Sequence, residues 1–157
     1  MNLTVSMDIL RRNTDYALRL MIALAGRPDD GAVSTRVLAE GQEVSYQLAC
    51  KLMQQLHDAR LVESDMGPKG GFRLSRPAGQ ISLRDVIEVV QGPLRINRCL
   101  LKAAACPRQK TCPVRTKIGE LQGRMDEYLG SVTLAELVRS RNGEKGTGAQ
   151  RRTGGRP

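Results

Sequence analysis

Apolar side chains near the start of the chain recur at the spacing of an amphipathic helix. They lie three and four positions apart over residues 15–25, and Gly26 begins the loop that follows. A second, shorter helix is predicted over residues 35–40, where Ser34 is a good N-cap and Gly41 a stop. The pattern therefore predicts two helices joined by a loop that contains glycine and proline.

A third helix with two different faces is predicted next, after Ser45. Its apolar face carries Leu48, Leu52, Met53 and Leu56, and the polar residues Gln47, Lys51, Gln54 and Gln55 lie largely off that face. A short helix, a tight turn and an amphipathic helix form a helix-turn-helix, whose second helix fits the major groove of DNA while the first braces it. Two helices of an all-α core would show the same pattern, so this pattern alone leaves both readings open.

A β-hairpin is predicted directly afterwards. Residues 61–63 and 72–74 have strand character, and the turn between them, from Gly67 to Gly71, contains Lys69. A helix-turn-helix followed by a hairpin is a winged helix, whose glycine-rich tip can approach the DNA backbone closely. The alternative is an ordinary glycine-rich hairpin.

Two more helices and a closing element complete the pattern. Ser82 and Asp85 form a capping box at the start of a helix that ends at residue 92. Over residues 114–128 the apolar spacing alternates between four and three, which predicts a long helix packed on a partner helix. The partner is a second copy of the chain or the first helix of the same chain. Residues 133–138 are expected to form a short helix or strand, and the tail beyond Ser140 to be disordered.

The net charge of +9 is unevenly distributed. Residues 139–157 hold six basic residues and one acidic residue, so the remaining chain is only mildly basic. A basic surplus fits a polyanionic partner such as DNA, although a solvated surface with a basic tail gives the same balance. No apolar stretch approaches the roughly 20 residues that span a bilayer, and the first residues lack the features of a secretory signal. We therefore expect a cytoplasmic protein that does not contact membranes.

Three of the four cysteines, Cys99, Cys106 and Cys112, lie close together in the sequence. In a reducing cytosol such a cluster indicates metal or redox chemistry before disulfides. Structural zinc sites usually pair cysteines two to four residues apart, and these intervals are wider, as suits the larger core of an iron–sulfur cluster. Two alternatives remain: the cysteines bind zinc, or they form a redox-active or merely buried set without a metal. The fourth cysteine, Cys50, lies in the predicted recognition helix and is expected to be a packed or solvent-edge thiol.

Several segments resemble the Rrf-two family of bacterial regulators, which includes the IscR-type, NsrR-type and RirA-type repressors. The matching pieces are TDYALR at 14–19, GPKGGF at 67–72, ISLRDVI at 81–87, VTLAELV at 132–138 and the three-cysteine loop. The likeness runs in unbroken order over residues 9–138. It implies a mainly α protein: a winged helix-turn-helix domain with a small β-hairpin wing and a long C-terminal dimerisation helix.

The resemblance also implies how such a protein works. It would be a homodimer that binds double-stranded operator DNA, usually as a repressor, with an iron–sulfur cluster near the dimerisation helix as the effector. The cluster would have to bind the DNA-competent and incompetent states with different affinities. By position, the DNA-contacting residues would be Arg11, Arg12, Ser45 (as the cap of the recognition helix), Tyr46, Gln47, Lys51 and Lys69.

The chain departs from the pattern of the family at two positions, 66 and 115, and matches one type of member at a third, Asp15. IscR-type proteins carry a histidine ligand three residues after the last cysteine, where this chain has Arg115. Asp15 matches an aspartate that completes a 4Fe–4S site from the other subunit in NsrR-type proteins, so a 4Fe–4S cluster is favoured over 2Fe–2S. The other interpretation of Asp15 is a helix-start residue favoured by the helix dipole. Met66 replaces an arginine frequent in the family wing, which argues against base-specific reading there.

The resemblance divides the chain into five parts. They are an N-terminal extension (1–8), the winged-helix domain (9–92), a cysteine loop (93–113), the dimerisation helix with the closing element (114–138) and a disordered basic tail (139–157). Two other functions stay open: a zinc-stabilised or cysteine-redox regulator without a cluster, and an iron–sulfur electron-transfer or carrier protein, which would need no winged helix. No histidine-activated cysteine and no phosphate-binding loop is visible, so we expect no enzymatic activity.

Overall fold

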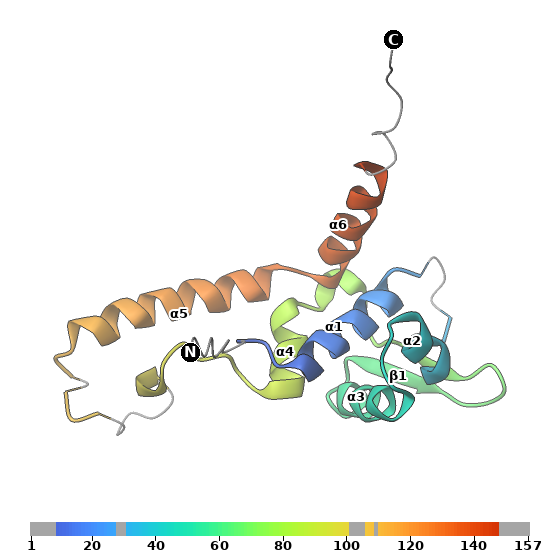
Figure 1. The fold of residues 1–157 in the computed structure, drawn as a ribbon, viewed down its shortest axis with the longest axis horizontal. Helices are drawn as coiled ribbons and strands as arrows, with labels where there is room; N and C mark the ends of the chain where they lie inside the picture. Colours follow the sequence, from blue (N-terminus) through green and yellow to red (C-terminus); the bar gives the residue numbers. More distant parts are fainter. Residues whose placement is uncertain (1–8, 28–30, 101–105, 109, 148–157) are drawn as a thin grey trace, which may run out of the picture.

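The computed structural model describes residues 9–27, 31–100, 106–108 and 110–147, and these are mainly helical (Figure 1). The α-helices are α1 (Arg12–Ala25), α2 (Thr35–Gly41), α3 (Tyr46–Asp58), α4 (Leu83–Gln91), α5 (Pro113–Ser131) and α6 (Leu134–Thr147). The strands are β1 (Val62–Asp65) and β2 (Gly71–Leu74), and two 3-10 turns are η1 (Ala78–Gln80) and η2 (Arg98–Leu100). The predicted mainly α fold with one β-hairpin is confirmed.

The core of the domain lies between α1, α3 and α4. Leu20 and Met21 of α1 and Leu52, Met53 and Leu56 of α3 are at most 1% exposed. Burying each such side chain contributes about 1.5–3 kcal/mol relative to an exposed one. The predicted apolar face of α3 is therefore the face that holds the recognition helix on the domain.

Side-chain caps start three of the helices where the sequence predicts them. Ser34 Oγ accepts a hydrogen bond from the Val37 amide at 3.3 Å at the start of α2. At α4, Ser82 Oγ accepts from the Asp85 amide at 3.1 Å and Asp85 Oδ2 accepts from the Ser82 amide at 2.8 Å, so the capping box is confirmed. Ser45 Oγ accepts from the Leu48 amide at 3.4 Å at the start of α3.

Helix α1 begins at Arg12, earlier than the start predicted at residue 15. Gln91, at the end of α4, supplies the reason. Its Oε1 accepts hydrogen bonds from the Arg11 amide at 2.9 Å and from Thr14 Oγ1 at 2.6 Å. These contacts hold the first turn of α1 against α4 and satisfy an amide that a helix start leaves without an intrahelical partner.

The wing is a two-stranded antiparallel hairpin in which Val62 pairs with Leu74 and Asp65 with Gly71. Phe72 also exchanges backbone hydrogen bonds with Val33, which ties the hairpin to the segment before α2. Gly71 has φ +154°, and a Cβ on it would overlap the Val33 backbone. Only glycine allows the two backbones to approach this closely.

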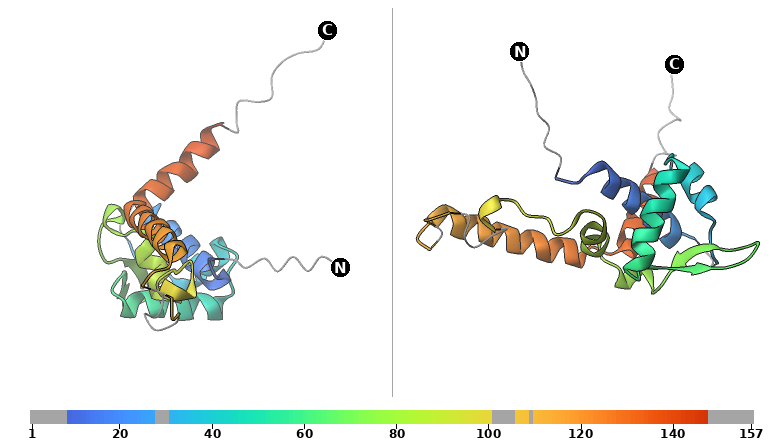
Figure 2. Two further views of the ribbon diagram at one scale, coloured as in Figure 1. Left: turned by 90° about the vertical axis from the view of Figure 1, so that its left-hand side faces the viewer. Right: turned by 90° about the horizontal axis from the view of Figure 1, so that it is seen from below.

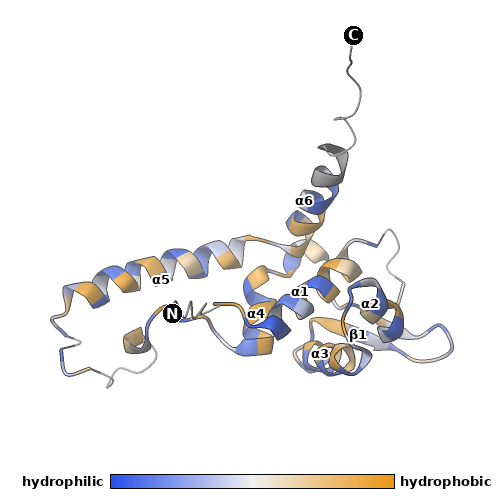
Figure 3. Cartoon of the chain, in the orientation of Figure 1, coloured by the Kyte–Doolittle hydropathy of each residue, from blue (hydrophilic) through white to orange (hydrophobic). Residues whose placement is uncertain are grey.

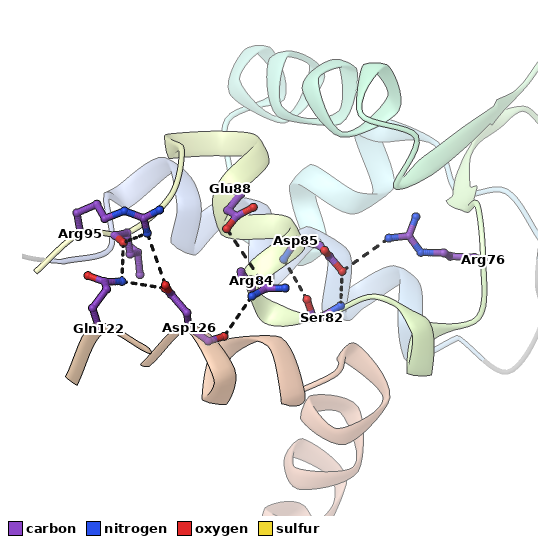
Figure 4. Close-up of polar contacts among 9 residues, drawn as sticks. Arg76, Ser82, Arg84, Asp85, Glu88, Arg95, Gln122 and Asp126 are labelled. Atoms are coloured by element: carbon purple, nitrogen blue, oxygen red, sulfur yellow. Dashed lines mark hydrogen bonds and ion pairs between the residues drawn. The ribbon is translucent and has the colours of Figure 1, made fainter. Parts of the chain in front are cut away.

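Helix α5 extends away from the winged-helix domain and is joined to it by polar contacts near α4 (Figures 1, 2 and 4). Gln122, 7% exposed, donates from Nε2 to the Leu94 carbonyl at 3.0 Å and to Asp126 Oδ1 at 2.8 Å. Its Oε1 accepts from the Ile96 amide at 3.0 Å. This one side chain therefore fixes the segment after α4 on the long helix.

Apolar residues recur along α5 (Figure 3), and several of them are exposed. Val114, Leu121 and Tyr128, which belong to the predicted seam, are 63%, 52% and 66% exposed. At these exposures the three side chains do not pack on α1, so the intramolecular alternative is wrong for them. Among the described residues, no helix is long and apolar enough to cross a membrane.

The closing element is a helix, and it is longer than expected. It begins at Leu134, which is fully buried, and continues to Thr147. The expectation of disorder beyond Ser140 is therefore wrong for residues 141–147, while residues 148–157 lie outside the described part. The half-buried side chain of Arg141 packs against Gly26, at the end of α1, and this contact supports the extra turns.

Candidate nucleic-acid interface and cysteine segment

The outer face of α3 is polar and exposed over its first turns. Tyr46, Gln47 and Lys51, the residues expected to face the major groove, are all exposed, as is the capping residue Ser45. The opposite face is buried in the core. A helix held this way can enter a groove of DNA with its N-terminal residues foremost.

Tyr46 is held by neighbours on two sides. The Arg36 guanidinium of α2 lies 5.3 Å from the centroid of the Tyr46 ring. A hydrogen bond with the Cys50 side chain raises the pKa of Tyr46 above its ordinary value of 10.0, although Arg36 opposes the shift. The phenol therefore remains a protonated hydrogen-bond donor near neutral pH. Cys50 is half-buried, as the sequence predicts, but sequence reasoning missed Arg36, whose partner is ten positions away.

The tip of the wing presents Lys69 and Met66 to solvent, and Met66 is 96% exposed. Two carboxylates lie behind the tip on β1. The Arg73 guanidinium pairs with Glu63 at 2.8 Å and with Asp65 at 3.3 Å. Arg73 thus offsets the negative charge next to the wing, a role that sequence reasoning missed although cross-strand pairing of 63 with 73 would indicate it.

Arg11, Arg12 and Asp15 lie exposed around the start of α1. The Asp15 carboxylate pairs with the Arg19 guanidinium at 2.8 Å, and both side chains are about half exposed (52% and 48%). A pair as exposed as this contributes at most about 1 kcal/mol. Another electropositive partner could therefore displace Arg19 from Asp15 at little cost.

The three clustered cysteines lie on the segment that joins α4 to α5. Cys99 is in η2, Cys106 is in the following loop and Cys112 is the N-cap residue of α5; all three are free and half-buried. Arg115 Nε donates to the Cys99 carbonyl at 3.4 Å, which holds η2 against the start of α5. Cys112 thus stands at the point where the loop meets the first turn of α5.

The described residues of one chain do not complete a ligand set. Within the described residues, no three histidine, cysteine or acidic side chains are close enough together to hold a metal ion. The donor chemistry does fit an iron–sulfur cluster, because three free thiols lie on one short segment without a disulfide between them. Asp15 is paired with Arg19 and is not grouped with the cysteines.

The turn η2 and the start of α5 lie at the opposite end of the molecule from the wing, in Figure 1 and in the right-hand view of Figure 2. The cysteine segment leads into the far end of α5, whereas the hairpin points the other way. A group bound at the cysteines could not touch the wing of the same chain.

An exposed recognition helix, a β-hairpin wing and a long projecting helix define a winged-helix transcription regulator. The Rrf2 family model, described as an iron-dependent transcriptional regulator, matches residues 10–140. The chain therefore belongs to the Rrf2 family, and the resemblance found in its sequence is confirmed.

Relatives support the same class. The transcriptional regulator IscR of Photobacterium profundum is 33% identical over 135 residues, covering 86% of this chain and 78% of the relative. The structure of IscR from T. potens aligns with a TM-score of 0.66 at 26% identity, covering 92% and 93% of the two chains. That of CymR, the global cysteine regulator of B. subtilis, aligns with a TM-score of 0.69 at 25% identity, covering 83% and 96%.

Proposed function

We propose that this chain is a DNA-binding repressor whose affinity for its operator is controlled by an iron–sulfur cluster. The observation that carries the proposal is the placement of three free cysteines on the one segment that joins the winged-helix domain to α5. In a dimeric regulator, an effector bound to this segment could change how the two DNA-binding domains are oriented relative to each other.

The DNA-binding half of the proposal uses the outer face of α3. Gln47 suits adenine and Lys51 suits guanine or a phosphate, and Tyr46 adds a ring and a hydroxyl donor beside them. Lys69 on the wing, Arg11 just before α1 and Arg12 at its first position would contact phosphates.

The assembly would be a homodimer. The exposed apolar residues of α5, Val114, Leu121 and Tyr128, need a partner, and a second copy of the same helix supplies one with two-fold symmetry. This pairing would leave the cysteine segment at the far end of α5, next to the DNA-binding domain of the second copy.

Cys99, Cys106 and Cys112 would hold the cluster, and Asp15 of the second copy would provide a fourth ligand. A 4Fe–4S cluster is favoured and 2Fe–2S is the alternative. When bound, the cluster supplies iron that reacts with nitric oxide or oxidants and is lost when iron is scarce. Arg115 keeps the Cys99 backbone in place.

The test is an anaerobic purification with ultraviolet–visible spectroscopy and iron and sulfide analysis. It compares wild type, Asp15→Ala and the control Asp58→Ala, which removes another exposed helical aspartate. We expect a brown protein that contains iron and acid-labile sulfide. Its visible absorbance and its iron and sulfide content should fall only in Asp15→Ala. Binding to a duplex that the wild type selects from a random-sequence library is then measured with and without the cluster. A colourless protein, or zinc alone after anaerobic reconstitution, would refute the cluster.

A second candidate is a winged-helix regulator that uses its cysteines without a cluster. Two observations favour it: the incomplete ligand set in the described chain and the similarity to CymR, a cysteine regulator. In that case the protein would bind the same duplex without iron, and its affinity would follow thiol oxidation or zinc.

A further inference from the structure

Arg36 is an exposed arginine on the first helix of the helix-turn-helix, outside the residues assigned to DNA contact above. In this motif the first helix crosses the DNA backbone while the second enters the major groove. An exposed basic side chain on that helix, on the side that faces the start of α3, therefore lies where a phosphate would pass.

The structure shows that Arg36 does face the start of α3. Its guanidinium lies 5.3 Å from the centroid of the Tyr46 ring, and Tyr46 is the first residue of the recognition helix. Among the described residues no carboxylate forms an ion pair with Arg36, although Glu40 lies one turn further along the same helix. The charge is therefore held by an aromatic face and remains available to an anion.

Tyr46 also has a neighbour on its own helix. The Cys50 side chain lies one turn along α3 and interacts with the Tyr46 hydroxyl, and Tyr46 is 51% exposed. Arg36, Tyr46 and Cys50 thus form a row from α2 to the outer face of α3. A guanidinium held beside an aromatic ring by a cation–π interaction keeps its N–H donors for other partners, and their planar arrangement matches the geometry of a phosphate.

The structure assigns to Arg36 a phosphate contact, with the guanidinium positioned by its cation–π interaction with Tyr46 at the edge of the recognition surface. The assignment rests on the proposed DNA-binding function. Because the contact is to a phosphate, Arg36 adds affinity for DNA of any sequence and fixes how deeply α3 enters the major groove. The preference for particular bases comes from the residues of α3.

The salt dependence of binding tests the assignment. Each phosphate contact contributes about 0.9 to the slope of log affinity against log salt, so its loss changes the effect of raising salt from about 50 to 200 mM by roughly three- to four-fold. The measurement is fluorescence anisotropy with the duplex that the anaerobically purified wild type selects from a random-sequence library. Arg36→Ala is compared with Arg139→Ala, which removes the same charge from an exposed position on α6.

We expect Arg36→Ala to weaken binding to all duplexes alike and to lower the slope by about 0.9 for each bound protomer. Arg139→Ala should leave the slope unchanged, and Arg36→Lys should retain most of it because the charge remains. Equal slopes for Arg36→Ala and Arg139→Ala, with circular dichroism showing both folded, would overturn the assignment alone. A wild type that selects no duplex would overturn the proposed function and the assignment with it.

Discussion

Replacing Gln122 with leucine tests how the segment after α4 is fixed on α5. The variant keeps a side chain of similar size but removes three hydrogen bonds, to the Leu94 carbonyl, the Ile96 amide and the Asp126 carboxylate (Figure 4). Asp126 keeps its ion pair with Arg95 at 3.7 Å. The cost therefore comes mainly from the two backbone groups that lose their partner.

An unsatisfied buried backbone group costs about 1–3 kcal/mol, and partial access of water at this site favours the lower end for each. We expect Gln122→Leu to lower the free energy of unfolding by about 2 kcal/mol. For a chain of 157 residues this corresponds to a fall in the unfolding midpoint of roughly 4–8 °C.

Thermal unfolding followed by circular dichroism measures the change, and hydrogen exchange of the Ile96 amide reports the local cause. Gln47→Leu is the matched control, because Gln47 is exposed on α3. Exchange at Ile96 should accelerate only in Gln122→Leu. Equal midpoints for the two variants, together with unchanged exchange at Ile96, would refute the view that this glutamine holds the segment.

Three further changes test the wing and a helix start. Gly71→Ala should destabilise the hairpin by more than about 1 kcal/mol, because its Cβ would overlap the Val33 backbone; a near-normal unfolding midpoint would contradict this. Ser82→Ala should cost about 1 kcal/mol by removing the cap of α4, and Ser82→Asp should restore most of it in the same melting assay. Arg73→Ala should weaken binding to any duplex several-fold at low salt by exposing two wing carboxylates, and unchanged affinity at about 50 mM salt would argue against that role.

The caps and the wing were predictable because they depend on residues close together in the sequence. Ser82 and Asp85 are three positions apart, and the glycines of the wing mark its turn directly. The apolar face of α3 was predictable because burial follows the helical period, as at Leu52 and Leu56. Local chemistry and periodicity therefore account for most of the winged-helix domain.

The remaining features depend on contacts between distant positions. A glutamine in the middle of a helix is usually a surface residue, yet Gln122 is 7% exposed because its partners Leu94 and Ile96 fold back from another part of the chain. The continuation of α6 beyond residue 140 brings Arg141 next to Gly26, a contact that no local pattern indicates. Composition alone favoured disorder there.

The same distant contacts bear on how the cysteine segment could influence the DNA-binding domain. One glutamine, Gln122, holds the segment at Leu94 and Ile96, and a second, Gln91, holds the end of α4 to Arg11 and Thr14 at the start of α1. Only the short stretch from Gly92 to Pro93 separates the two sets of contacts. Allosteric control requires an element with two arrangements that both sites can bias. The junction between these glutamines connects the cysteine segment to α4 along the backbone, and the hydrogen bonds of Gln91 continue that connection to α1. The three-cysteine spacing and the helix-turn-helix pattern are each recognisable in the sequence, but neither carries information about this junction.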